Sequence, residues 1–336
     1  MNAILDDIKK ILDNPLWHLC RSNTENAMSN FWAYLMEQNN NDLAIIIGKG
    51  NANKHEGNVN CILREKNHMD LQVIFENGSI VVIENKFKSL ADRKQIDKYE
   101  NKIKELGGDK YHFYLITPTG YEDFTNDKLT WLSYQNVYHN ITEEKNSFKK
   151  GKEIIGKYLE LLKDILDLCT TTKGDPELCF FWKEIDNNKK TLIEELKEEK
   201  LYAFIAKNLA SNYQRELNKE LKELEGIVET ECGFTCTWPL MSWMKKNKKG
   251  YIEGIQIQNG QFRLFVLSED KKSDVKKEDL NEWVATLNSE GLVVNSRKEY
   301  NKFGVCFKYK YFNIGSKEAL EENLKKVFNY WKNQSH

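Results

Sequence analysis

The most constraining feature of the chain is an apolar segment, Ile80-Val81-Val82-Ile83, that runs directly into Glu84-Asn85-Lys86. β-Branched residues favour a strand, and side chains along a strand alternate between its two faces, so Glu84 and Lys86 share one face. A carboxylate and an ammonium group at the end of an apolar strand are costly unless they are exposed, paired or used in chemistry. The segment therefore predicts a strand of a sheet that carries a polar site at its end.

Asp70 begins the preceding predicted strand, and Asn77-Gly78 marks the hairpin turn between the two strands. With a two-residue turn at Asn77-Gly78, Asp70 would lie on the opposite face from Glu84. A three-residue turn over residues 77–79 instead pairs Asp70 with Lys86 and brings all three polar side chains to one face. We therefore predict a three-residue turn or a bulge in this hairpin.

One carboxylate from each of two neighbouring strands makes a site of hard oxygen ligands, which suits Mg²⁺. A lysine beside such a site can hold an attacking water and offset the charge of a phosphate. The alternative interpretation is an exposed salt bridge of Lys86 with Glu84 or Asp70 at the end of the hairpin. Such surface pairs are common and contribute little to stability.

Hydrophobic periodicity predicts helices and strands on both sides of this hairpin, and a break near residues 170–176, Thr-Thr-Thr-Lys-Gly-Asp-Pro. The break predicts two domains, residues 1–170 and residues 177–336, of which the second is an α+β domain. Before the break, the sequence predicts helices that start near Ile4 and Ser22, a helix over 90–106, strands over 111–116 and 129–132, and a helix over 151–169.

The arrangement Asp70…Glu84-Asn85-Lys86 resembles the signature of the PD-(D/E)xK nuclease superfamily. The following segment, Gln95 to Tyr99, resembles the Q-x3-Y helix motif of its exonuclease-like branches. The resemblance covers roughly residues 20 to 170 and extends to two downstream strands of a bacterial and phage branch. Met69 stands where the family name expects a proline, a position that is loose in the superfamily.

The resemblance implies a restriction-endonuclease-like α/β core, with a mixed central sheet flanked by helices. It implies that Asp70, Glu84 and the carbonyl of Asn85 bind Mg²⁺, for which Mn²⁺ is expected to substitute. Lys86 would position the attacking water, and Gln95 would face the site. The expected activity is hydrolysis of phosphodiester bonds, of DNA in preference to RNA.

Two further residues have alternative interpretations. The family resemblance gives Glu25 a role as a metal ligand in the first core helix, whereas the local sequence also fits a capping box between Ser22 and Glu25. The resemblance implies that Tyr99 supports the site, whereas the alternative is that Tyr99 packs with Ile103 and Leu106 in the core.

Composition excludes a protein that holds nucleic acid by bulk charge, because 50 Lys and Arg residues balance 51 Asp and Glu residues to a net charge of −1. The seven cysteines are scattered and odd in number, which favours a reducing compartment, so we expect a cytoplasmic protein. No apolar run approaches the length that crosses a bilayer, and no membrane partner is expected. The lysine run 245–249 is interpreted as a solvated turn in preference to a nucleic-acid contact.

An alternative function is a catalytically inactive nuclease-like module that binds nucleic acid or a protein partner. The second domain is open to three roles, which are target recognition, partner binding and formation of a homodimer.

Overall fold

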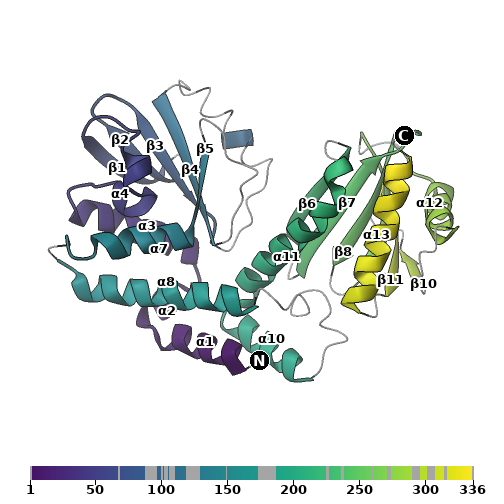
Figure 1. The fold of residues 1–336 in the computed structure, drawn as a ribbon, viewed down its shortest axis with the longest axis horizontal. Coiled ribbons are helices and arrows are strands. Elements are labelled where there is room, and N and C mark those ends of the chain that lie inside the picture. Colours follow the sequence, from purple (N-terminus) through teal and green to yellow (C-terminus); the bar gives the residue numbers. More distant parts are fainter. Residues whose placement is uncertain are drawn as a thin grey trace. The chain divides into compact units, whose positions relative to one another are not determined.

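In a computed structural model, the chain divides into two compact units, which are described separately (Figure 1). The first unit comprises Met1–Gly174 with Leu196–Phe204, and the second comprises Asp175–Glu195 with Ile205–His336. The stretch Leu196–Phe204, which follows the predicted break, thus packs with the first unit. The structure describes residues 2–66, 69–87, 97–99, 101, 105, 110–118, 129–148, 150–172, 187–224, 227–235, 238–258, 261–270, 274–289, 296–300, 307–313 and 316–334.

The first unit contains a five-stranded mixed sheet in the order β1-β2-β3-β4-β5. Strand β2 runs antiparallel to β1 and to β3, whereas β3, β4 and β5 run parallel to one another. This sheet confirms the predicted mixed α/β class. The strands are β1 (Val59–Lys66), β2 (Met69–Phe75), β3 (Ile80–Asn85), β4 (Tyr111–Thr117) and β5 (Leu129–Ser133).

Helices cover one face of this sheet, where α3 contacts the three antiparallel strands and α7 follows β5 (Figure 1). The long helix α8 packs against α1, α2 and α7. Pro15 ends α1 as predicted and begins α2, whose N-cap Asn14 accepts a hydrogen bond from the Leu16 amide at 3.0 Å. The helices are α1 (Asn2–Asp13), α2 (Pro15–Cys20), α3 (Thr24–Gln38), α4 (Ala44–Ile47), α5 (Lys49–Ala52), α7 (Tyr134–Glu144) and α8 (Lys152–Thr172).

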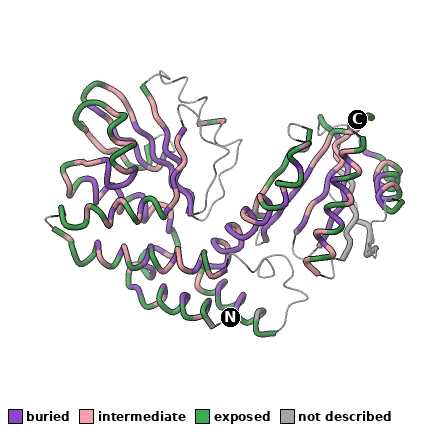
Figure 2. Tube along the Cα trace, in the orientation of Figure 1, coloured by how far each residue is buried: buried purple, intermediate pink, exposed green. Residues whose placement is uncertain are grey.

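Strand β3 lies at the centre of the sheet and is buried from Val81 to Asn85 (Figure 2). On one face, Val82 packs with Phe113 and Leu115 of β4 in a cluster of buried side chains. On the other face, α3 contacts the strand. The end of β3 is therefore enclosed by side chains from both sides.

The hairpin between β2 and β3 has a three-residue turn, as predicted, but over residues 76–78 instead of 77–79. The Phe75 amide donates to the Ser79 carbonyl at 2.9 Å, and the Gly78 amide donates to the Phe75 carbonyl at 2.9 Å. Gly78 has a φ of +81°, a left-handed conformation that glycine adopts without steric cost. The turn thus lies one residue earlier than predicted.

This difference moves every cross-strand pair by two residues. Leu71 pairs with Ile83, so the next position along the register places Asp70 opposite Glu84. The predicted pairing of Asp70 with Lys86 is therefore wrong. Because side chains alternate with a period of two, the shift preserves the face, and Asp70 still lies on the same face as Glu84.

The second unit contains a six-stranded antiparallel sheet in the order β10-β11-β9-β8-β7-β6. Helix α12 packs against β9 and β11, and α13 packs against α12. No described helix in either unit has both the length and the apolar character needed to cross a bilayer. The remaining elements are α10 (Asn187–Glu198), α11 (Tyr202–Asn218), the 3-10 helix η3 (Lys219–Leu224), β6 (Val228–Thr235), β7 (Trp238–Lys246), β8 (Tyr251–Gln258), β9 (Gln261–Ser268), α12 (Lys277–Ser289), β10 (Ser296–Tyr300), β11 (Phe307–Asn313) and α13 (Lys317–Asn333).

Candidate active site

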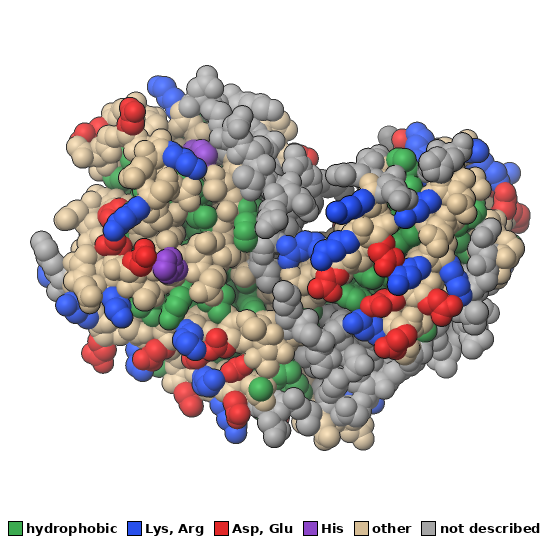
Figure 3. Space-filling model, in the orientation of Figure 1, with side chains coloured by type: hydrophobic (Ala, Val, Ile, Leu, Met, Phe, Trp, Pro, Cys, Tyr) green, Lys and Arg blue, Asp and Glu red, His purple; other side chains and the backbone are tan. Residues whose placement is uncertain are grey.

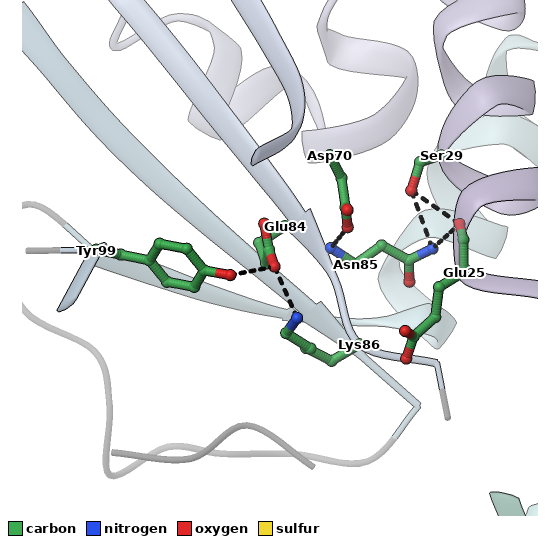
Figure 4. A network of polar contacts seen from close by, with 7 residues as sticks. All are labelled: Glu25, Ser29, Asp70, Glu84, Asn85, Lys86 and Tyr99. Carbon is green, nitrogen blue, oxygen red and sulfur yellow. Dashed lines mark hydrogen bonds and ion pairs between the residues drawn. The ribbon is translucent and has the colours of Figure 1, made fainter. Parts of the chain in front are cut away.

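The end of β3 carries a buried ion pair. The Lys86 ammonium donates to Oε1 of Glu84 at 2.7 Å, and the side chains of Lys86 and Glu84 are only 10% and 2% exposed (Figure 4). The interpretation of these residues as an exposed surface salt bridge is therefore wrong. Two buried charges require further polar partners, because burial removes the solvation that both ions have in water.

Tyr99 supplies one such partner from the segment that follows β3. Its hydroxyl donates to the same Oε1 of Glu84 at 2.5 Å (Figure 4). The Tyr99 ring stacks on Phe113, with ring centroids 5.0 Å apart, and packs against the buried cluster of the sheet. Tyr99 therefore both contacts the site and contributes to the core, so the two interpretations of this residue are compatible.

Three residues of the sequence prediction lie outside the described residues. They are Gln95, which was predicted to face the site, and Ile103 and Leu106, which were predicted to accompany Tyr99 in the core.

Asp70 and Glu84 form a pair of carboxylates that interact with each other beside the Lys86 ammonium group. Burial and, after it, the nearby charge of Glu84 raise the pKa of Asp70 to about 7. A hydrogen bond from the Asn85 amide and the charge of Lys86 act in the opposite direction. Oε2 of Glu84 is buried without a hydrogen-bond partner among the described residues. The pair thus combines like-charge repulsion with an unsatisfied acceptor, which a cation would relieve.

Asn85, the last residue of β3, makes hydrogen bonds both to Asp70 and to residues of α3. Its main-chain amide donates to Oδ2 of Asp70 at 2.7 Å. Its side-chain Nδ2 donates to the Glu25 carbonyl at 2.9 Å and to Oγ of Ser29 at 3.2 Å, while Oδ1 accepts a hydrogen bond from the Tyr134 hydroxyl. Since the side chain is occupied in these bonds, only the main-chain carbonyl of Asn85 could contribute to a metal site.

Glu25 lies in the first turn of α3, and Figure 4 shows its side chain extending from that helix alongside Asn85. The helix begins at Thr24, and its N-cap Asn23 makes no side-chain capping bond. The predicted capping box between Ser22 and Glu25 is therefore wrong, because Ser22 lies before the N-cap. Burial is the main cause of the raised pKa of the Tyr134 hydroxyl, and the nearby charges of Glu25 and Asp70 act in the same direction, so both carboxylates lie near this hydroxyl.

Ser29 and Tyr134 were not identified from the sequence. Ser29 lies one helical turn after Glu25 and donates to its carbonyl at 2.9 Å. Tyr134 is fully buried at the start of α7. Neither residue stands at a spacing that the motif defines. The pairing of β4 with β3 and of β5 with β4 brings Tyr134, which follows β5, toward Asn85.

The donor set fits a hard divalent cation. Asp70 and Glu84 offer carboxylate oxygens, one of which has no hydrogen-bond partner in the described part of the chain. Mg²⁺ is commonly held by one or two carboxylates with the remaining positions filled by water. Among the described residues, no three His, Cys, Asp or Glu side chains gather into a metal-binding group. A cation here would therefore depend on these two carboxylates, with the Asn85 carbonyl and Glu25 as the further predicted ligands.

The lysine run 245–249 covers the end of β7 and most of the turn to β8, and it lines a pocket of about 250 Å³ in the second unit. Lys246 and Lys249 form ion pairs with Glu269 and Glu282 at 2.5 and 2.6 Å. Figure 3 shows basic and acidic side chains interspersed on the visible face of this unit. Acidic partners thus offset much of the positive charge of the run, in keeping with its interpretation as a solvated turn.

No protein-family model matches the sequence, and no curated protein and no solved structure matches it either.

Proposed function

We propose that this chain is a metal-dependent nuclease of the PD-(D/E)xK type that hydrolyses phosphodiester bonds, with DNA as the expected substrate. The observation that carries the proposal is the pair of Asp70 and Glu84 on adjacent strands. Oε2 of Glu84 is buried without a hydrogen-bond partner among the described residues, and burial together with repulsion within the pair raises the pKa of Asp70. Paired titratable groups with perturbed pKa values are concentrated at functional sites.

The order of the elements supports a restriction-endonuclease-like core. Helix α3 precedes the antiparallel strands β1, β2 and β3, and the parallel strands β4 and β5 follow. The carboxylates lie on β2 and β3, which are neighbours at the centre of this sheet. The resemblance implies a helix, three strands, a second helix and a further strand, and most of the second predicted helix, over 90–106, lies outside the described residues.

Each polar residue has a role in this proposal. Asp70 and Glu84, with the Asn85 carbonyl and Glu25, would hold Mg²⁺. When bound, Mg²⁺ lowers the pKa of water and neutralises charge on the phosphate. Lys86 would orient the attacking water and offset negative charge on the phosphate oxygens as the P–O bond breaks. Tyr99 keeps the Glu84 carboxylate in place through its hydrogen bond.

One observation favours a second candidate function. Oε1 of Glu84 already accepts hydrogen bonds from Lys86 and Tyr99, so this part of the network is complete without a cation. A nuclease-like module that binds nucleic acid or a protein without cleavage would retain such a network for stability. The two candidates differ in whether Mg²⁺ or Mn²⁺ binds at Glu84.

The test is to incubate the purified protein with plasmid, linear duplex DNA, single-stranded DNA and RNA, each with Mg²⁺ and with EDTA. We expect cleavage with Mg²⁺ only, and we expect Glu84→Ala and Lys86→Ala to abolish it while the circular dichroism spectrum stays that of a folded protein. Retained cleavage in either variant would contradict the mechanism. Absence of cleavage in the unmodified protein, together with nucleic-acid binding, would support the second candidate.

A further inference from the structure

Asn85 is the residue through which α3 and the carboxylate pair are held together. Its main-chain amide bonds to Asp70, and its side chain bonds to the carbonyl of Glu25 and to Ser29. The side chain is 1% exposed, so water does not compete for these bonds. One buried residue therefore links the Glu25 main chain on α3 to the Asp70 carboxylate on β2.

The Glu25 carbonyl selects the orientation of the Asn85 side-chain amide, and the Tyr134 hydroxyl holds it. A reversed amide would point Oδ1 at the Glu25 carbonyl, which would place two acceptors together, because a carbonyl oxygen can only accept. In the observed orientation, Nδ2 faces the two acceptors on α3 and the Tyr134 hydroxyl donates to Oδ1. The hydroxyl thus anchors the other end of the amide.

Tyr134 is itself held firmly. Its ring is fully buried and lies 5.7 Å from the Trp32 ring and 5.6 Å from the Phe87 ring, between centroids. The preceding residue, Ser133, caps α7 by accepting a hydrogen bond from the Asn136 amide at 3.1 Å. Packing and the helix start therefore determine where the hydroxyl points.

We propose that Tyr134 and Asn85 are positioning residues, which set the affinity of the site for a divalent cation by fixing Glu25 and Asp70 relative to Glu84. The inference rests on the proposed nuclease function, and it adds Tyr134 and a role for the Asn85 side chain, which the sequence motif does not assign. Outer partners of ligand side chains typically change metal affinity or activity by 10- to 100-fold. The side chains of both residues act through Glu25 and Asp70, by way of the hydrogen bonds of Asn85.

The test compares Tyr134→Phe with Tyr158→Phe. Tyr158 is equally buried and its hydroxyl accepts a hydrogen bond from Trp32 at 2.6 Å, but no hydrogen bond joins it to Asn85 among the described residues. We expect Tyr134→Phe to weaken Mn²⁺ binding, measured by calorimetry, by about tenfold. At a fixed Mn²⁺ concentration below saturation, kcat should fall while KM for DNA stays within about twofold, since the scissile strand is not contacted. Tyr158→Phe should leave both values unchanged.

Ser29→Ala provides a second variant that keeps Tyr134 intact. It removes the longer of the two bonds from Nδ2, so we expect a smaller loss of Mn²⁺ affinity in the same direction. If Tyr134→Phe, Tyr158→Phe and Ser29→Ala all bind Mn²⁺ as tightly as wild type does, the positioning role is overturned and the nuclease proposal stands. A wild-type protein that neither binds Mn²⁺ nor cleaves DNA would refute the proposed function, and the positioning role would fall with it.

Discussion

The hydroxyl of Tyr99 donates a hydrogen bond to Oε1 of Glu84 at 2.5 Å. The same oxygen accepts a hydrogen bond from the Lys86 ammonium at 2.7 Å, which leaves Oε2 without a partner among the described residues. Two donors thus hold Oε1 of Glu84, and Oε2 is left to contact a cation. This relationship connects the helical segment after β3 to the chemistry proposed for the site.

Replacing Tyr99 with phenylalanine tests that connection. Tyr99→Phe keeps the ring that stacks on Phe113 but removes the donor, so the free energy of unfolding should fall by only about 1 kcal/mol. Cleavage should fall by about tenfold, because Glu84 loses a partner that orients it. Urea denaturation and initial cleavage rates measure the two effects.

Tyr114→Phe is the matched control for this prediction. Tyr114 lies on the other face of β4, and its hydroxyl bonds to Nε2 of His55 at 3.0 Å. We expect a comparable loss of stability with an unchanged cleavage rate. If both variants reduce cleavage equally, Tyr99 acts only through general stability.

Asp70 gives a pH dependence whose sign follows from its pKa. An aspartate in the unfolded chain has a pKa of about 3.9, whereas burial and Glu84 raise the pKa of Asp70 to about 7. Between these values the folded state binds more protons than the unfolded state, so stability falls as the pH rises from about 4 to about 7. Without a divalent cation, this destabilisation is fully present above pH 7 and absent below pH 4.

Asp70→Asn removes the charge but keeps an oxygen that can accept the Asn85 amide bond. The pKa rises from about 3.9 to about 7, which is about three tenfold changes in the ionisation constant, each worth about 1.4 kcal/mol. In EDTA at pH 8, we therefore expect this variant to be more stable than wild type by as much as about 4 kcal/mol. Near pH 4 the difference should vanish. Denaturation curves across this range measure it, and a variant that is less stable at pH 8 would show that Asp70 is not strained by its neighbours.

Phe204 belongs to a segment outside the predicted nuclease domain of residues 1–170, yet it stacks on Phe87 with centroids 4.4 Å apart and planes 3° apart. Both rings are buried, and Phe87 directly follows Lys86. Phe204→Ala should therefore lower the stability of the first unit by about 3 kcal/mol. In calorimetry, this loss should appear in the unfolding transition whose melting temperature Mn²⁺ increases. A loss confined to a transition that Mn²⁺ does not affect would contradict the packing.

The sequence predicts the elements around the site because their signals are local. Alternation marks the strands, and Pro15 and Gly78 mark a helix boundary and a turn. The predicted turn lies one residue later than the observed one, because the Asn77-Gly78 sequence is compatible with more than one loop length. The face shared by Asp70 and Glu84 survives this error, since a shift of two residues preserves the alternation.

The contacts of Asn85 could not be predicted from the sequence. Its partners on α3 and α7 are Ser29 and Tyr134, which lie 56 and 49 residues away along the chain. No local pattern distinguishes an asparagine that joins two helices from one that faces solvent. The capping box at Ser22 failed for a related reason, because the N-cap lies at Asn23 and the local motif does not fix the residue at which a helix starts.

The most direct test of the account is whether a divalent cation binds at Glu84. The melting temperature of the wild-type protein and of Glu84→Gln should be measured with and without Mn²⁺, with Glu76→Gln in the exposed hairpin turn as control. A cation at 100 times its dissociation constant stabilises a folded protein by about 2.7 kcal/mol, so wild type and Glu76→Gln should melt at clearly higher temperatures with Mn²⁺. Glu84→Gln should show no such increase. An equal increase in all three proteins, or none in wild type, would contradict the metal site.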